Sequence, residues 1–318
     1  MKWLNALAIT VVGTALIAGL IRILNPLPPL DNRTQSRAYG DTQATPLGTS
    51  IRPLVEKHRG LSGVHLLDDA RAALAIRASL ARAATRSIDA QYYAWHDDES
   101  GRLLFNELRS AADRGVRVRL LLDDNNTSGM DEIIAALDAH PGIEVRLFNP
   151  FTIRSPRLIG FLTDFPRLNR RMHNKSFTID NQVTIVGGRN IGDEYFGAGD
   201  SALFVDLDVF AIGPIVSDVS DDFDRYWSSA SSYPADRIVA PAKRPEAQQA
   251  QRGVGGDQQR GPATRCRPGA AALVAGGAVL DLLMTLEAEA AFRASLAHYQ
   301  AQGAQRRGGA PECGACRQ

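Results

Sequence analysis

The chain of 318 residues is long enough for one large domain or two modest ones, and its 36 lysines and arginines almost balance 35 aspartates and glutamates. The resulting formal net charge of +1 excludes a global electrostatic attraction to nucleic acid or to an anionic membrane. All three cysteines, Cys266, Cys313 and Cys316, lie in the last fifth of the chain, which excludes a disulfide framework from the rest.

The N-terminal segment is apolar. From Leu4 to Ile21 the sequence contains no charged residue, and as a helix this run would be about 27 Å long, close to the thickness of a bilayer core. Residues 1–24 are therefore predicted to be a membrane anchor or a signal peptide. The sequence that follows lacks a small-x-small cleavage site, which favours retention as an anchor. Residues 25–60 contain five prolines among polar residues, and we expect a tether without helix or strand.

Residues 61–240 alternate between helical and strand patterns. The expected helices cover residues 68–84, 100–114, 130–139 and 214–230, and the expected strands cover residues 86–95, 116–122 and 143–148. This alternation predicts an α/β domain, in which a mixed and mostly parallel sheet is flanked by helices. Asp123 follows a buried strand, at the sheet edge where α/β proteins gather functional groups.

A basic segment follows this part of the domain. It contains Arg154, Arg157, Arg167, Arg170, Arg171 and Lys175. Few acids separate these residues, so the local field is expected to favour an anionic ligand, the alternative being a solvated basic face. A short helix is expected at residues 158–169, and its mixture of arginines and apolar residues fits either contact with lipid or packing on the sheet.

The most informative pattern is a His-x-Lys pair, His173 and Lys175, followed by Asp180 and by Gly187-Gly188-Arg189-Asn190. Strands are expected at residues 175–179 and 183–186, with a turn between them. Because side chains alternate along a strand, His173 and Lys175 should point to the same face. A neutral imidazole supplies a nucleophile near pH 7, while the ammonium group of Lys175 and the amide of Asn190 orient phosphate oxygens. The pattern predicts a phosphoryl-transfer site that needs neither a metal nor another cofactor.

This pattern resembles the HKD signature of the phospholipase D superfamily, and residues 170–175 and 188–196 resemble its bacterial cardiolipin synthase branch. The similarity runs from about Leu66 to Ala235. It implies a phospholipase D-like sandwich that is one lobe of a normally two-lobed enzyme. The roles it implies are a phosphohistidine-forming nucleophile at His173, phosphate contacts from Lys175, Gly188 and Asn190, a motif-holding residue at Asp180, and a carboxylate at Asp206, or Asp208, that orients the imidazole. The alternative is that these last two aspartates cap or solvate the start of a strand.

Enzymes of this superfamily bring two such motifs together, one histidine attacking phosphorus and the other transferring the proton of the alcohol. In this sequence only His173, of six histidines, is followed two residues later by lysine. From about residue 241 the composition shifts to alanine, glycine, arginine and glutamine. Our hypothesis is that residues 241–318 are an aberrant, frameshifted tail, disordered or partly helical, in place of the second lobe.

The resemblance implies a phosphatidyltransferase or phosphodiesterase that acts on phosphatidylglycerol or a similar phospholipid at a bacterial cytoplasmic membrane. The signal-like N-terminus favours the extracytoplasmic face. With a single motif, the chain would be active only as a homodimer that pairs two motifs. The alternatives are a phospholipase D-like nuclease, which the anchor and the neutral charge disfavour, and an inactive remnant.

Overall fold

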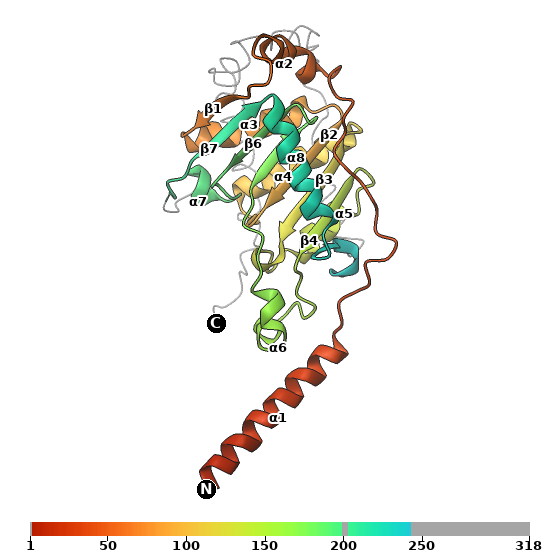
Figure 1. Ribbon diagram of the computed structural model, residues 1–318, viewed down its shortest axis with the longest axis vertical. Helices are drawn as coiled ribbons and strands as arrows, with labels where there is room; N and C mark the ends of the chain where they lie inside the picture. Colours follow the sequence, from red (N-terminus) through yellow and green to blue (C-terminus); the bar gives the residue numbers. More distant parts are fainter. Residues whose placement is uncertain (1, 199–202, 243–318) are drawn as a thin grey trace, which may run out of the picture.

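The computed structural model describes residues 2–198 and 203–242. In Figure 1 one long helix, α1 (Lys2–Leu24), projects from a domain that is built on a single sheet. Among the described residues, α1 is the one helix that is long and apolar enough to cross a membrane, and none of its residues is buried. The predicted aberrant tail lies outside the described residues, apart from its first two.

The domain contains further helices and eight strands. The helices are α2 (Pro46–Lys57), α3 (Ala70–Ala83), α4 (Glu99–Asp113), α5 (Asp131–Asp138), α6 (Leu158–Leu168), α7 (Asp193–Phe196) and α8 (Pro214–Ser228), with short 3-10 turns η1 (Asp124–Asn126) and η2 (Ala235–Arg237). The strands are β1 (Gly63–Leu67), β2 (Ser87–Tyr92), β3 (Arg117–Asp123), β4 (Ile143–Phe148), β5 (Ser176–Ile179), β6 (Val183–Gly187), β7 (Asp208–Ile212) and β8 (Ser232–Pro234).

The strands form one sheet in the order β1-β7-β6-β5-β2-β3-β4-β8. The predicted α/β class, a mixed sheet flanked by helices, is confirmed, but the expectation of mostly parallel strands is wrong. Only β2 with β3 and β3 with β4 pair in parallel, and the other five pairs are antiparallel. Parallel neighbours need a helical crossover, which α4 and α5 supply, whereas the three-residue turn between β5 and β6 makes that pair antiparallel.

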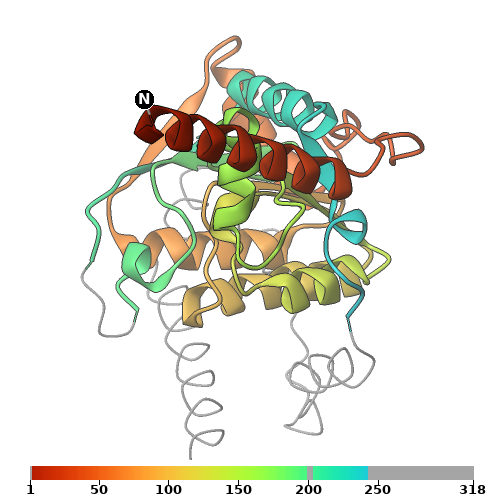
Figure 2. The ribbon, with the colours of Figure 1, turned by 90° about the horizontal axis from the view of Figure 1, so that it is seen from below.

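Helices cover both faces of the sheet. Figure 2 shows α3, α4 and α5 on one side and α8 on the other. The main core lies between the sheet and the first group, where Leu74, Leu104 and Val118 are completely buried. A smaller cluster lies beneath α8 and consists of Leu121, Phe148, Met172, Phe223 and Trp227. Since Met172 precedes His173, the packing of α8 helps to fix the predicted nucleophile.

Helix ends follow the sequence signals. Asp69 caps α3 by accepting a hydrogen bond from the amide of Ala72 at 2.7 Å, and Asp98 caps α4 through the amide of Gly101 at 2.9 Å. Gly115 ends α4, as predicted, with a φ of +91° that suits glycine.

Two arginines are buried on the α8 face of the sheet. Arg119, with a side chain 1% exposed, bonds both oxygens of Asp89 at 2.6 and 2.8 Å and contacts Asp224 at 2.7 Å. Arg146 is 1% exposed, pairs with Glu144 at 2.6 Å, and lies over the ring of Trp227 at 4.1 Å from its centroid. These ion pairs attach α8 and the chain around it to the sheet.

The predicted tether contains a helix, so the expectation that residues 25–60 form neither helix nor strand is wrong for α2. The hydroxyl of Thr45 accepts a hydrogen bond from the amide of Gly48 at 3.1 Å, and Pro46 occupies the first turn, where its missing N–H costs nothing. Leu47 and Ile51 join the main core. Proline therefore begins this helix instead of preventing it.

Residues 25–45, which we call the strap, have no helix or strand but are bonded to the domain along their length. The carbonyl of Thr34 accepts from Arg146 at 2.5 Å, and that of Ser36 accepts from Arg119 at 3.1 Å. Arg33 donates to the carbonyl of Ser229 at 2.7 Å. The strap is therefore a connection between α1 and the domain that is held to the domain by hydrogen bonds.

Candidate active site

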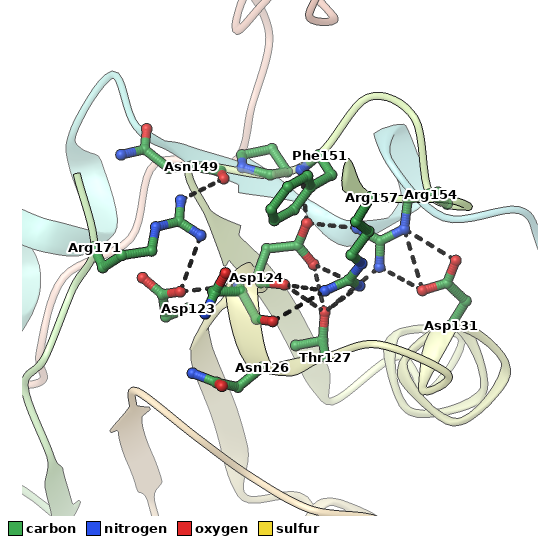
Figure 3. A network of polar contacts seen from close by, with 12 residues as sticks. Asp123, Asp124, Asn126, Thr127, Asp131, Asn149, Phe151, Arg154, Arg157 and Arg171 are labelled. Atoms are coloured by element: carbon green, nitrogen blue, oxygen red, sulfur yellow. Dashed lines mark hydrogen bonds and ion pairs between the residues drawn. The ribbon is translucent and has the colours of Figure 1, made fainter. Parts of the chain in front are cut away.

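The predicted nucleophile lies at the end of a loop, residues 169–175, which joins α6 to β5 and which we call the motif loop. Asp123, the last residue of β3, is completely buried and accepts hydrogen bonds from the amide of Met172 at 2.7 Å and from Arg171 at 3.1 Å. Arg171 also donates to the carbonyl of Asn149 at 2.7 Å (Figure 3). The ends of β3 and β4 therefore hold the motif loop immediately before His173.

His173 and Lys175 meet, as predicted, although both lie in the motif loop and the strand begins only at Ser176. The Nζ atom of Lys175 lies 3.2 Å from Nδ1 and 3.3 Å from Nε2 of His173, and it donates to the carbonyl of His173 at 2.9 Å. The imidazole is exposed, whereas Lys175 is buried. Tyr93, which the sequence analysis did not single out, packs against the imidazole with ring centroids 4.5 Å apart.

The surroundings of His173 favour its neutral form. Burial, and then the positive charge of Lys175, lower the pKa of His173 from its ordinary value. Burial also lowers the pKa of Lys175, against the opposing effect of the carboxylates of Asp206 and Asp208. A neutral imidazole keeps a nitrogen lone pair free for attack, and the adjacent cation is placed to neutralise an anionic substrate.

A cavity of about 360 Å³ opens beside this pair. His173, Lys175 and Gly187 line it from the motif, and Asp218 and Asp222 line it from α8. The volume lies at the lower end of the range of small-ligand pockets, which is suitable for one headgroup.

The two glycines of the motif make room for acidic side chains. A β-carbon at Gly187 would lie 2.1 Å from Oδ1 of Asp208, and one at Gly188 would lie 1.8 Å from Oδ1 of Asp206. The amide of Gly188 donates to the carbonyl of Leu207 at 3.1 Å. The glycines therefore allow the carboxylates of these aspartates to approach the main chain. The amide of Gly188, a predicted phosphate contact, already donates a hydrogen bond within the protein.

Asp206, the predicted orienting carboxylate, lies near Lys175 instead of bonding the nucleophile. Its Oδ1 accepts from the amide of Leu207 at 2.8 Å. Within residues 2–198 and 203–242 no hydrogen bond joins Asp206 to His173. The orienting role stays a prediction that needs a rearrangement of Asp206.

Asp208, the alternative to Asp206 as the carboxylate that orients the imidazole, is bonded to arginines. It is completely buried and bonds Arg77 at 2.8 Å, with Arg189 at 3.5 Å. Arg77 was missed by the sequence analysis, although it leaves a signal. It stands among the apolar residues of α3 at helical spacing from Ala73 and Leu80, where a charge needs a buried partner.

Asn190 is buried, and both ends of its amide have partners. Its oxygen accepts from the amide of Ala94 at 3.0 Å, and its nitrogen donates to the hydroxyl of Tyr195 at 2.9 Å. Because an amide nitrogen carries two hydrogens, the predicted phosphate contact depends on the second one.

Asp180 lies at the far end of β5 from the nucleophile. Lys175 and Asp180 are five residues apart, which corresponds to roughly 16 Å of extended chain. The carboxylate accepts from the amides of Thr85 at 3.2 Å, Arg86 at 2.7 Å and Ser87 at 2.9 Å. These contacts fit a residue that holds the fold around the motif and do not place it at the reaction centre.

Four of the five arginines of the basic segment are neutralised, and Arg170 is the exception among the described ion pairs. Each of four guanidinium groups has a carboxylate partner: Arg154 with Asp124 and Asp131, Arg157 with Asp124, Arg167 with Asp164, and Arg171 with Asp123. Figure 3 shows three of these arginines around the acidic end of β3. The expected field for an anionic ligand is therefore largely cancelled, and Lys175 is the cation left at the cavity.

One group of possible metal ligands occurs among the described residues. His96, Asp98 and Glu194 have ligand atoms within 4.8 Å of one another. They are bonded already, since His96 lies 3.0 Å from Glu194 and Asp98 accepts amide hydrogens from Gly101 and Asp193. This arrangement is complete without a cation.

Comparison with known proteins finds similar sequences and structures. Residues 77–227 match the family model described as cardiolipin synthase, PLD-like domain. The chain is 59% identical over 193 residues to cardiolipin synthase C of Escherichia coli (strain K12), covering 61% of this chain and 41% of that protein. It is 32% identical over 152 residues to a cardiolipin synthase of Staphylococcus aureus (strain Mu50), covering 48% of this chain and 29% of that protein.

Among solved structures, phosphatidylserine synthase of Haemophilus influenzae Rd KW20 is similar with a TM-score of 0.45 and 14% identity, over 65% of this chain and 47% of that one. The chain spans 41% or less of the length of the curated relatives it matches. Residues 77–227 of this chain, the part that the family model matches, are therefore similar to a phospholipase D-like domain of the cardiolipin synthase type.

Proposed function

We propose that this chain supplies a phosphodiester-transfer site for phospholipids, as in a cardiolipin synthase, with His173 as the nucleophile. One observation carries the proposal: the imidazole of His173 is exposed and lies 3.2 Å from the ammonium group of Lys175, and its lowered pKa favours the neutral form. A ring nitrogen of His173 attacks phosphorus, and the bond to the leaving alcohol breaks, giving a phosphohistidine. An acceptor hydroxyl then attacks the same phosphorus, gives its proton to the group that protonated the leaving alcohol, and the bond to the histidine breaks.

The substrate that fits best is a phospholipid with a small hydroxylated headgroup, such as phosphatidylglycerol. Lys175 and the second amide hydrogen of Asn190 are the proposed phosphate contacts. Asp218 and Asp222 line the same cavity, and carboxylates accept hydrogen bonds from hydroxyl groups. The α1 anchor would hold the domain at the membrane, with the extracytoplasmic face favoured by the signal-like N-terminus.

We further propose that residues 61–240 act as one lobe and need a second histidine from another copy of the chain. The alcohol that leaves must receive a proton, and Lys175 is the only other titratable side chain within hydrogen-bond distance of His173 among the described residues. A two-fold dimer that brings two motifs together would supply that proton donor.

The test uses the full chain, reconstituted with labelled phosphatidylglycerol and, separately, incubated with plasmid DNA. His173→Ala should abolish lipid turnover, whereas His140→Ala should retain it, because His140 pairs with Asp113 at 3.0 Å and does not line the cavity. DNA cleavage that depends on His173 would support a nuclease instead. No turnover of either substrate would support an inactive remnant.

Light scattering on the same sample tests the dimer. Lipid turnover by a strictly monomeric chain would contradict the need for a second motif.

A further inference from the structure

Helix α6, which leads into the motif loop, has two different sides. On the inner side, a β-carbon at Gly160 would come within 2.9 Å of the ring of Phe151, and Leu168 is buried. Phe161 packs edge-on against Phe151, with ring centroids 5.2 Å apart. This side fastens α6 to the domain.

The outer side carries a stripe of exposed large apolar residues. Leu158 is 66% exposed and Leu162 73%, and their spacing of four residues places them on one helix face. Phe165, 56% exposed, follows a kink at Asp164, where φ is −143° and ψ is 39°. We call these three residues the α6 stripe. Contiguous exposed apolar surface of this kind marks an interaction with a membrane or a partner.

The stripe lies beside the candidate membrane helix. Helix α1 packs against α6, and Arg22 in the last turn of α1 pairs with Asp164 of α6 at 2.9 Å. Figures 1 and 2 show α6 at the end of the domain from which α1 extends. A basic residue at the end of a membrane-spanning helix reaches toward the lipid headgroups, so the pair with Arg22 puts α6 at that depth.

The charges of α6 are compatible with this depth. Asp164 pairs both with Arg22 and with Arg167, the latter at 2.5 Å, so no isolated charge accompanies the stripe. The helix has 11 residues and is kinked at Asp164, so its length is at most about 16 Å, too short to cross a bilayer but suited to lie along its surface.

We propose that α6 inserts the α6 stripe into the interfacial layer of the bilayer that α1 crosses. This inference rests on the membrane attachment by α1 that the proposed function includes. It adds a second contact with the bilayer, through α6, which the motif loop joins to His173. His173 follows Leu168 by five residues, at most about 18 Å of extended chain. Insertion of α6 therefore holds the nucleophile within reach of the phosphates of the headgroup layer.

The experiment uses the full chain in lipid nanodiscs of phosphatidylglycerol and phosphatidylcholine, with the three native cysteines replaced by serine. An environment-sensitive fluorophore is attached at Leu162→Cys on the stripe. The matched control is Val64→Cys on β1, an apolar residue that is 67% exposed far from α6, and Leu16→Cys on α1 reports the anchor. Fluorescence is recorded with and without a nitroxide quencher on the lipid acyl chains.

The label at Leu162 should shift its emission to shorter wavelength and lose intensity with nitroxide lipid, while the label at Val64 should do neither. The inference is overturned if Leu162 behaves like Val64 while Leu16 is quenched. A shift at Leu162 without quenching also overturns it, because a protein partner would then cover the stripe. If Leu16 itself is not quenched, membrane attachment fails together with the inference.

Discussion

Replacing Asp180 distinguishes a structural from a catalytic role for the third residue of the motif. Its completely buried carboxylate accepts from three consecutive backbone amides, Thr85, Arg86 and Ser87, and from the Thr85 hydroxyl at 3.0 Å. Its backbone has a φ of +51°, in the left-handed region. Asp180→Ala removes all four acceptor contacts and strains the backbone.

The magnitude follows from these contacts. Three lost amide bonds at about 1 kcal/mol each, plus about 1 kcal/mol for alanine in the left-handed region, lower the free energy of unfolding by about 4 kcal/mol. Asp180→Gly avoids the backbone strain and should lose about 3 kcal/mol. Asp180→Asn keeps one oxygen for Arg86 and Ser87 and tolerates the backbone, so it should lose only about 1 to 2 kcal/mol.

The assay is urea unfolding of the full chain in detergent micelles, followed by the fluorescence of Trp95 and Trp227, which are both buried in the domain. Lipid turnover is measured below the unfolding transition. We expect the order Asn, Gly, Ala in increasing loss of stability, and turnover in Asp180→Asn close to that of the wild type.

The reasoning is refuted if Asp180→Asn and Asp180→Ala both unfold within about 0.5 kcal/mol of the wild type and yet abolish turnover as His173→Ala does. That result would place Asp180 in the chemistry and not in the fold.

Three further predictions concern charge. Burial, with added repulsion from Asp236, raises the pKa of Asp138 to about 6. The pKa of an aspartate in the unfolded chain is about 3.9, so Asp138 lowers the free energy of unfolding as the pH rises from about 4 to about 6. Asp138→Asn should therefore be more stable than the wild type above about pH 6 and equally stable below about pH 4, as urea unfolding at each pH would show. Lys175→Met should raise the pKa of His173, because the positive charge that helps to lower this pKa is removed. An NMR titration of the imidazole protons would show the change. Arg119→Met should lower the free energy of unfolding by about 3 kcal/mol, since Asp89 stays buried with only the more distant Arg117, 3.8 Å away, as a cation, whereas Arg119→Lys should lose less.

The site is connected to the rest of the molecule through elements that contact the motif loop. Asp123 holds its backbone from β3, and α8 covers Met172. Helix α6 precedes the loop and carries the exposed stripe. A disturbance in any of these three elements is therefore expected to move His173, although only α6 is proposed to touch lipid.

Much of the fold was predictable because it depends on local signals. The strand at Ile143–Phe148 has the predicted bounds, and α4 begins and ends within one residue of its prediction. Both follow from short-range causes, an apolar run in one case and an amphipathic pattern closed by Gly115 in the other. The α2 helix was missed because Pro46 and Pro53 were taken to exclude a helix, whereas a proline in the first turn is tolerated.

The meeting of His173 and Lys175 was predicted from strand alternation, but both residues lie in the motif loop before β5, so their spacing of two residues places them together without strand geometry. Sequence alone therefore determined the class of the fold and the pairing of His173 with a cation, Lys175, while the nucleophilic role of His173 stays a prediction. Only the tertiary structure decided which strands pair, which charges are neutralised and what the aspartates do. Asp208 and Arg77 are 131 residues apart, and the basic segment loses its field to acids from β3 and its surroundings. Such pairings depend on which chain segments meet in space, and spacing along one segment does not specify them.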